Sequence, residues 1–500
     1  MENNSAHQSG AWYSTQNPLL AGLPQYNELP DFRDALAFNP LDKINIHSLN
    51  FMERDALLVG EKVPLEPMMQ NLRAAMTWYG MLTQGLRARN PILPEARKHY
   101  WDVLQAVAME KALPPFPTTG MSIHVVKGPT GTGKTVTVQR FCQMLPQVIN
   151  HSQNAAAGWV QLSQLVYLDV MMSHDGSRGG FLQNILMKMD LALGTNYSVD
   201  LPKKWKTVEK LAVATIGRLI AHFCGIIFID EGQLRNLVLS GQAELMQTFL
   251  LLLMNSGIPT VFVGNEVAFD WVTYSQDKSR LNINPPEIFS PVGAIDYPGV
   301  EDDWNAVSTG IMKYFVLKNP IENWEECRKL LRQYSGGIAR LGLTLWCSMQ
   351  RNLLFSGKES AGPEDLTFAY KSESYDELRP LADGFHFRKV DLLMNFPDVN
   401  ASFYAKHWGV PLKGEKEAPR QSEQSKPQSP PKDGQTKKKP ASGKTKFAQE
   451  KARETKRAKE RAEKSKTLDE DDIRKQGLVN VNLEGLEKAR KAAEQERSDS

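Results

Sequence analysis

The sequence predicts an α/β fold in which a parallel β-sheet carries helices on both faces, with an all-helical domain after it. Two observations lead to this prediction. Between residues 122 and 290, apolar runs of strand length alternate with stretches of helical periodicity, and this alternation is typical of parallel strands joined by crossover helices. From residue 300 to residue 372, helical periodicity continues without strand-like runs.

The elements follow one another in a regular order. Residues 66–88 and 95–112 have helical periodicity, and the prolines that follow Leu113 end the second helix. We expect strands at Ser122–Val126, Leu165–Val170, Gly225–Ile229, Thr260–Val263 and Glu287–Ser290. We expect helices between them at 134–145, 180–193, 207–222 and 241–256.

The two ends of the chain differ from this region in composition. Residues 1–60 are rich in Pro, Asn and Leu, and the stretch NPLLAGLPQYNELPDF predicts an extended segment that packs either on the chain's own surface or on a partner. Residues 413–446 have almost no apolar side chains, which predicts disorder. The chain carries a net charge of only +3, but between Lys413 and Lys466 there are 18 Lys or Arg against 8 Asp or Glu. The basic character therefore belongs to the tail.

Several broad classes of protein are excluded by composition. The start MENNSAHQSG has neither the basic nor the apolar region of a signal peptide. We find no run of the ~18 apolar residues that a membrane span requires. The four cysteines are far apart and form no CxxC pair, so we expect Cys142 and Cys224 to be small core residues. These features predict a cytoplasmic protein without a membrane partner.

A glycine-rich motif follows the first predicted strand and opens a helix. The sequence GPTGTGKT fits the pattern GxxxxGK[ST], whose backbone N–H groups close around phosphate oxygens at a helix N-terminus. We expect Lys134 to reach the β- and γ-phosphates and the Thr135 hydroxyl to bind Mg²⁺. The nucleotide contacts are expected from Gly128, Pro129, Thr130, Gly131, Thr132, Gly133, Lys134, Thr135 and Val136. The alternative is a glycine-rich turn that binds nothing.

A second motif, IIFIDE, is an apolar strand that ends in two carboxylates. Because the carboxyl ends of parallel strands meet at one edge of the sheet, Asp230 and Glu231 are expected beside the phosphate loop. Asp230 would hold Mg²⁺, and Glu231 would orient and deprotonate the attacking water. The alternative is a solvated strand end before the turn at Gly232.

Three further polar residues are candidates for the same site. Asn265 follows another apolar strand and could hydrogen-bond the γ-phosphate and the attacking water, or only cap a turn. Arg280, in DKSRLN, and Arg340, in GGIAR, are candidates by position for a catalytic and a nucleotide-binding arginine. Each could equally be a solvated surface side chain.

Basic side chains also occur in two predicted connections. Arg178 lies in HDGSRGG, and Lys203, Lys204 and Lys206 lie in LPKKWKT. Contacts with DNA phosphates would account for them, and a solvated charged loop would account for them equally well.

Together these motifs predict an ATP- and Mg²⁺-dependent P-loop NTPase of the AAA+ type. We expect an N-terminal partner-binding extension at 1–95, an α/β nucleotide-binding core at 96–295 and a helical lid at 296–412. The remaining residues, 413–500, form a basic disordered tail that ends in a partner-binding peptide.

The core also resembles the TnsC family of AAA+ transposition regulators over about residues 120–375. The resemblance lies in LPQVINHSQ, QLVYLDVMMSHDGS, DLALGTNY and IIFIDEGQLRNL, with a weaker match at NPLLAGLP. It implies ATP-dependent assembly of subunits, as a ring or a helix, around double-stranded DNA in the bacterial cytoplasm at the nucleoid. It also implies a bridge from a target-selector protein or RNA-guided complex to the transposase and endonuclease subunits.

The resemblance assigns endonuclease docking to Leu468–Leu478, a segment that contains the similar patch LDEDDIRKQ. The stretch after Asn265 aligns loosely, so Arg280 and Lys278 both remain candidates for an arginine-like role in a neighbouring subunit's site. Two alternatives to a transposition regulator remain. One is another AAA+ machine, such as a replication initiator or helicase loader, which should carry a DNA-reading module after residue 372. The other is a scaffold that does not hydrolyse ATP.

Overall fold

The computed structural model describes residues 16–59, 63–116, 123–173, 177–230, 253, 256–265 and 284–411. Several predictions fall on other residues and so lie outside the described part. They are those for Glu231, Lys278, Arg280, most of the helix at 241–256, and the tail from residue 413.

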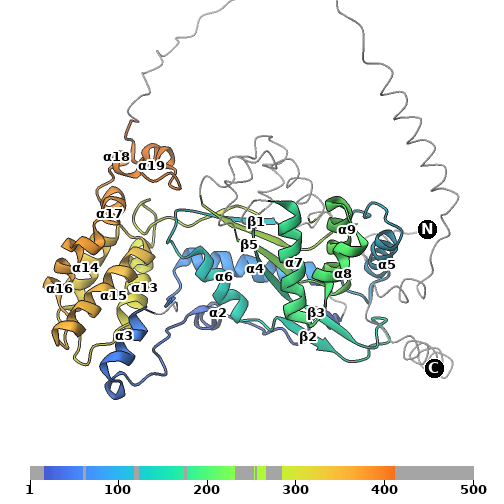
Figure 1. Ribbon diagram of the computed structural model, residues 1–500, viewed down its shortest axis with the longest axis horizontal. Coiled ribbons are helices and arrows are strands. Elements are labelled where there is room, and N and C mark those ends of the chain that lie inside the picture. The colour runs from blue at the N-terminus through green and yellow to red at the C-terminus, as the bar shows by residue number, and fades with distance from the viewer. Residues whose placement is uncertain are drawn as a thin grey trace, which may run out of the picture.

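A five-stranded parallel sheet forms the centre of the molecule (Figure 1). The strands are β1 (Ile123–Lys127), β4 (Tyr167–Met171), β5 (Ile226–Asp230), β6 (Thr260–Gly264) and β7 (Glu287–Ile288). Their order is β4-β5-β6-β1-β7, and every pairing is parallel. The predicted parallel sheet is therefore confirmed. Since Lys127 pairs with Gly264 and Asp230 with Val263, the carboxyl ends of β1, β5 and β6 meet at one edge.

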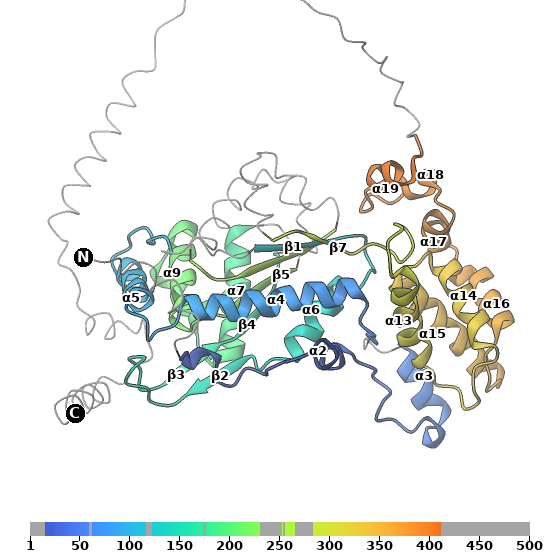
Figure 2. The same cartoon turned by 180° about the vertical axis from the view of Figure 1, so that it is seen from behind.

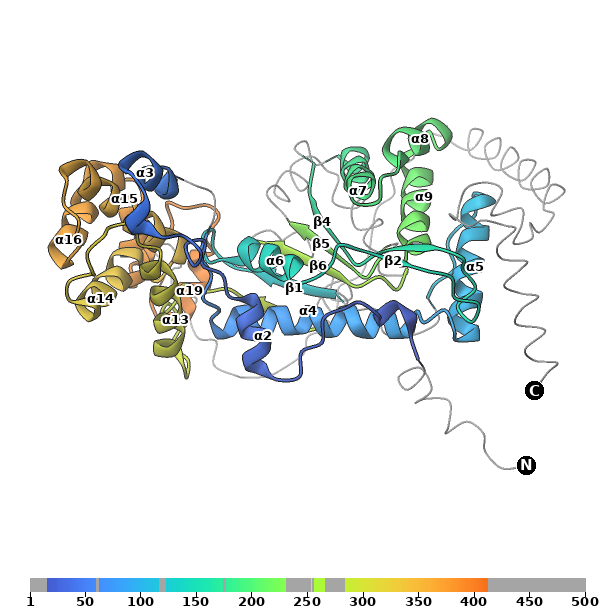
Figure 3. The ribbon, with the colours of Figure 1, turned by 90° about the horizontal axis from the view of Figure 1, so that it is seen from below.

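Helices cover both faces of the sheet, as predicted. The flanking helices are α4 (Met69–Ala88), α5 (Pro94–Ala108), α6 (Lys134–Gln143), α7 (Arg178–Leu193) and α9 (Val208–Ala221). Side chains alternate across a strand, so Ile227 and Ile229 pack with α5, α7 and α9. Phe228 faces the other way and packs with α4 and α6. Figure 2 shows α4 crossing one face, and Figure 3 shows α7 and α9 on the opposite side.

Three elements between α6 and α9 were not predicted. An antiparallel pair, β2 (Val148–His151) and β3 (Leu162–Leu165), lies between α6 and β4. Strand β2 carries no fully buried side chain, so it lacks the apolar pattern that marks a strand. Helix α8 (Tyr197–Lys204) contains Pro202, and it occupies most of the stretch that we expected to be a connection.

The N-terminal segment packs on the chain itself. It contains η1 (Pro18–Leu20), α2 (Leu29–Leu36), η2 (Ile46–Ser48) and α3 (Phe51–Val59). Leu19 and Leu36 are completely buried in the core cluster on the α4 side of the sheet. Farther along, Arg54 of α3 forms an ion pair of 2.6 Å with Glu359 beside the helical domain. The segment therefore bridges the sheet domain and the helical domain.

The helical domain follows the sheet, as predicted. Its main cluster is built by α13 (Val300–Lys313), α14 (Trp324–Ser335), α15 (Ala339–Ser356) and α16 (Pro363–Lys371). After η3 (Glu373–Tyr375), the helices α17 (Arg379–His386), α18 (Val390–Leu393) and α19 (Ala401–Trp408) form a smaller cluster around Phe385 and Tyr404. We call residues 379–408 the C-terminal helical module. In the described part of the chain, no helix combines the length and apolarity needed to cross a membrane.

A buried histidine in β1 makes stability depend on pH. Trp78 Nε1 donates to His124 Nδ1 at 2.9 Å, so this nitrogen carries no proton. Burial lowers the pKa of His124 from 6.5 to about 4. Below pH 6.5 the unfolded chain binds the proton and the folded chain does not, so stability falls as the pH drops from about 6.5 to about 4. The expected loss from this group is about 3 kcal/mol.

Denaturant unfolding between pH 7.5 and pH 4 measures this loss. His124→Gln keeps an acceptor for Trp78 but does not titrate, so its stability should fall by about 3 kcal/mol less over the same range. Equal losses in the two proteins would contradict the assignment.

Candidate nucleotide-binding site

The phosphate loop, residues 128–133, connects β1 to α6, and its shape depends on glycine. Gly128 has φ of 156°, and a Cβ there would lie 2.1 Å from the carbonyl oxygen of Phe289. Gly133 precedes the first residue of α6 with φ of 95°. These positions let the backbone turn sharply under the N-terminus of α6. The helix dipole adds positive potential there, which favours an anion.

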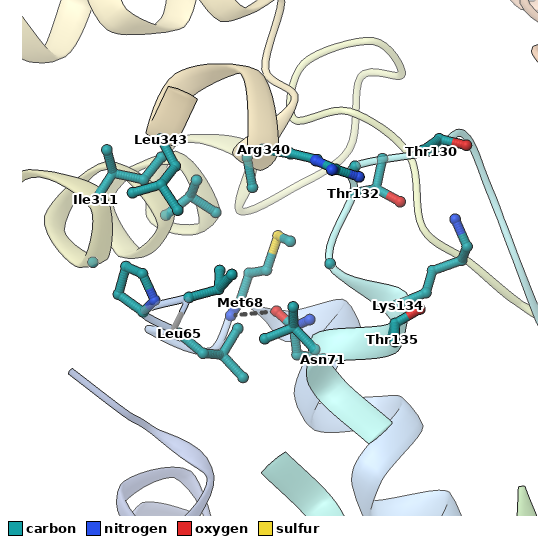
Figure 4. A pocket seen from close by; sticks show the side chains of 18 of the residues that line it. Leu65, Met68, Asn71, Thr130, Thr132, Lys134, Thr135, Ile311, Arg340 and Leu343 are labelled. Atoms are coloured by element: carbon teal, nitrogen blue, oxygen red, sulfur yellow. Dashed lines mark hydrogen bonds between the residues drawn. The ribbon is translucent and has the colours of Figure 1, made fainter. Parts of the chain in front are cut away.

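Lys134, the first residue of α6, folds its side chain back onto this loop. Its Nζ donates to the carbonyl oxygens of Gly128 and Pro129, both at 2.8 Å. Thr132 Oγ1 also donates to Pro129 at 2.9 Å and is buried. The ammonium group is thus held against the first two residues of the loop, and Lys134 also lines the cavity described below. Figure 4 shows Lys134 and Thr135 side by side at the start of α6.

The predicted metal ligands are in contact. Thr135 Oγ1 donates to Asp230 Oδ2 at 2.8 Å, across 95 residues of sequence. A hydroxyl and a carboxylate are oxygen ligands of the kind that Mg²⁺ prefers, so these residues fit that ion. Asp169, on the neighbouring strand β4, pairs in register with Phe228 and is close enough to Asp230 to sense its charge. Burial, and to a lesser extent the Asp230 carboxylate, raises the pKa of Asp169.

A cavity of about 620 Å³ extends from the loop toward the helical domain. Its far wall is apolar and comes from two parts of the chain. Val63, Pro64, Leu65 and Met68 come from the segment before α4, and Val307, Ile311 and Leu343 come from the helical domain. An apolar wall opposite a phosphate loop suits the base of a nucleotide. No motif marks these residues, because only the folded chain brings the two segments together.

Asn265 and Arg340 both line this cavity, as does Val136. Asn265 follows β6 directly, next to the strand that ends at Asp230. The backbone N–H of Arg340 donates to the carbonyl of Gly131 at 3.0 Å. Its side chain is exposed and extends toward the loop near Thr132 (Figure 4). The structure therefore gathers the loop, Asp230, Asn265 and Arg340 at one place.

The basic residues predicted to contact DNA lie apart from this cavity, and they are not all in loops. Arg178 is the first residue of α7, and its side chain, only 19% exposed, pairs with Glu209 of α9 at 3.4 Å. Lys203 and Lys204 end α8, where Lys204 lies over the Trp205 ring at 4.5 Å. Lys206 is exposed before α9. The ion pair joins the first turns of α7 and α9, and α9 begins two residues after Lys206.

The sheet order, phosphate loop and helical lid define an AAA+ P-loop NTPase fold. Residues 118–271 match the family model described as AAA domain. No curated protein matches the chain.

The solved structures that are similar to the chain include the following three. Drosophila ORC bound to DNA is 12% identical, with a TM-score of 0.37, over 78% of this chain and 84% of that one. Cdc6p from Pyrobaculum aerophilum is 12% identical, with a TM-score of 0.39, over 71% and 85%. The Aeropyrum pernix ORC1 protein in complex with DNA is 17% identical, with a TM-score of 0.34, over 64% and 80%. At such TM-scores these similarities do not bear on function.

Proposed function

We propose that this chain is an ATP-dependent, DNA-binding AAA+ regulator of transposition. It assembles on duplex DNA and links a target-selecting protein to the transposase. The observation that carries the ATP-dependent part is the cavity in which Lys134, Thr135 and Asp230 face an apolar wall built by other segments. The resemblance of the core sequence to the TnsC family supports the transposition part.

Each part of ATP hydrolysis is assigned to particular residues of the chain. The loop N–H groups and Lys134 bind the phosphates, while Thr135 and Asp230 would hold Mg²⁺. That ion supplies positive charge against the charge that develops on the phosphate oxygens. Asn265 orients the γ-phosphate and the attacking water. Glu231, directly after Asp230, accepts the proton of that water.

The position of the cavity means that nucleotide binding would affect how the domains are arranged relative to one another. Its walls come from the core, the helical domain and the segment before α4, so a bound nucleotide would fix these parts relative to one another. Self-assembly into a ring or helix would then place Arg280 or Lys278 of one subunit at the site of the next. Hydrolysis acts as a timer that ends the assembled state.

The proposed DNA contacts are Arg178, which pairs with Glu209 in this structure, and the lysines Lys203, Lys204 and Lys206. Replacing the three lysines by Gln should weaken duplex binding about equally for all sequences, because phosphates carry no sequence information. The slope of log affinity against log salt should fall by up to about 3. Fluorescence anisotropy at several salt concentrations, with an ATP analogue present, measures both.

A matched control removes the same charge from the helical domain. Lys313, Lys329 and Lys371 are exposed there, and their replacement by Gln should leave the slope unchanged. An equal loss in both triple variants would contradict a DNA surface at α8. A strong preference of the unchanged chain for one DNA sequence would favour a replication initiator instead.

The tail is proposed to tether a peptide that binds the endonuclease subunit. Leu468, Ile473 and Leu478 restore apolar side chains beyond the basic run, a pattern suited to folding on a partner. A truncation after Lys466 keeps the basic run. It should retain ATPase activity and DNA binding but lose the endonuclease in a pull-down. If the truncated chain still binds the endonuclease, the peptide assignment is wrong. If the truncation loses ATPase activity, the tail is part of the folded ATPase.

A further inference from the structure

A carboxylate from the C-terminal helical module contacts the phosphate loop. Thr130 Oγ1 donates to Asp398 Oδ2 at 2.8 Å, although the residues are 268 positions apart. Thr130 lies at the opposite end of the cavity from Leu65 and Met68, on the side of Lys134 (Figure 4). Asp398 therefore reaches the phosphate end of the site and not the apolar end.

Asp398 is held where it is by its neighbours. Val399 is buried in the module's own cluster, and the Asn400 side chain caps α19 by accepting from the Phe403 N–H at 3.1 Å. The module is in turn attached to the segment after β7. Trp408 Nε1 donates to the carbonyl of Ala294 at 2.7 Å, and Arg388 pairs with Asp296 at 2.8 Å. These contacts fix the backbone at Asp398 next to the loop, and the carboxylate can leave Thr130 either by rotation of its side chain or by movement of the module.

The Asp398 carboxylate places a negative charge next to the phosphate loop, which itself favours anions. The loop, the N-terminus of α6 and Lys134 favour phosphate, whereas Asp398 repels it. A nucleoside triphosphate extends farther along the loop and carries more negative charge than a diphosphate. Thr130 is exposed, so water screens the repulsion in part.

We propose that Asp398 is a specificity-determining residue that weakens ATP binding relative to ADP binding. Full ATP binding then requires the Asp398–Thr130 hydrogen bond to break and the carboxylate to move away from the loop, through rotation of its side chain or a shift of the module. Residues 409–500 follow this module in the sequence, so a shift of the module on ATP binding would also move the start of the tail. The inference deepens the proposed function, because it rests on ATP binding at this site.

Isothermal titration calorimetry of the full chain with Mg²⁺ tests the proposed role of Asp398, with ADP and a non-hydrolysable ATP analogue as ligands. Asp398→Asn keeps the size of the side chain and an acceptor for Thr130 but removes the charge. We expect it to tighten binding of the analogue about tenfold while ADP affinity changes less than about twofold, a differential of about 1.4 kcal/mol. Asp398→Glu keeps the charge and should retain the affinity ratio of the unchanged chain.

Asp376→Asn is the matched control. It removes one carboxylate, paired with Arg379 at 2.7 Å, from the connection before the module, and the affinity ratio should stay the same. Equal changes for both ligands in Asp398→Asn would overturn the inference. Weaker binding of the analogue would also overturn it, since Asp398 would then assist ATP, for instance through the metal. If the unchanged chain binds neither ligand, the proposed function fails and the inference fails with it.

Discussion

Glu231→Gln should slow ATP hydrolysis by about 10²–10⁴-fold, the range for removal of a general base. Glutamine has the size of glutamate but cannot accept the proton of the attacking water. Binding should change little, because the loop, Thr135 and Asp230 remain. Single-turnover hydrolysis separates the chemical step from binding, and calorimetry gives the affinity.

The control for this variant is Glu364→Gln, which removes an exposed carboxylate from α16 and should hydrolyse ATP at the normal rate. If hydrolysis is a timer, Glu231→Gln should also stay on duplex DNA longer after ATP is added. Normal turnover by Glu231→Gln would show that another residue is the base.

Lys134→Ala should lose most of the ATP affinity. Charge-assisted hydrogen bonds contribute about 1.5–3 kcal/mol each, so the dissociation constant should rise at least about tenfold. The substitution also removes the two contacts that Lys134 makes with Gly128 and Pro129, which leaves the loop less ordered. Calorimetry with ATP and Mg²⁺ measures the change. Lys313→Ala, at an exposed lysine in the last turn of α13, serves as the control, and unchanged affinity in Lys134→Ala would refute the assignment.

The central strands could be predicted from sequence to within one or two residues, because they are buried on both faces. Strand β5, for example, buries each side chain from Ile226 to Ile229, which leaves a continuous apolar run. Strand β2 could not be predicted, because none of its side chains is fully buried and its two apolar residues, Val148 and Ile149, are adjacent and do not alternate with polar ones. Helix α8 was missed because Pro202 and two lysines favour a turn in isolation, whereas Leu201 and the following Trp205 are buried against the core.

Part of the candidate site could likewise be predicted from sequence, and part could not. The phosphate loop and Asp230 follow from short motifs, since backbone geometry at the end of a parallel strand requires particular residues there. The apolar wall depends on tertiary folding, which brings Leu65 and Ile311 together across the site. The contact of Thr130 with Asp398 spans 268 residues, and no local pattern indicates it.

Electron microscopy of the chain with duplex DNA, in the presence of either a non-hydrolysable ATP analogue or ADP, tests ATP-dependent assembly on DNA most directly. We expect rings or helical filaments around the duplex with the analogue, and sparse or no assemblies with ADP. Assemblies should form on duplexes of unrelated sequence, because the proposed contacts reach only phosphates. Equal assembly with both nucleotides, or none with the analogue, would contradict the proposal that ATP controls the DNA-bound state.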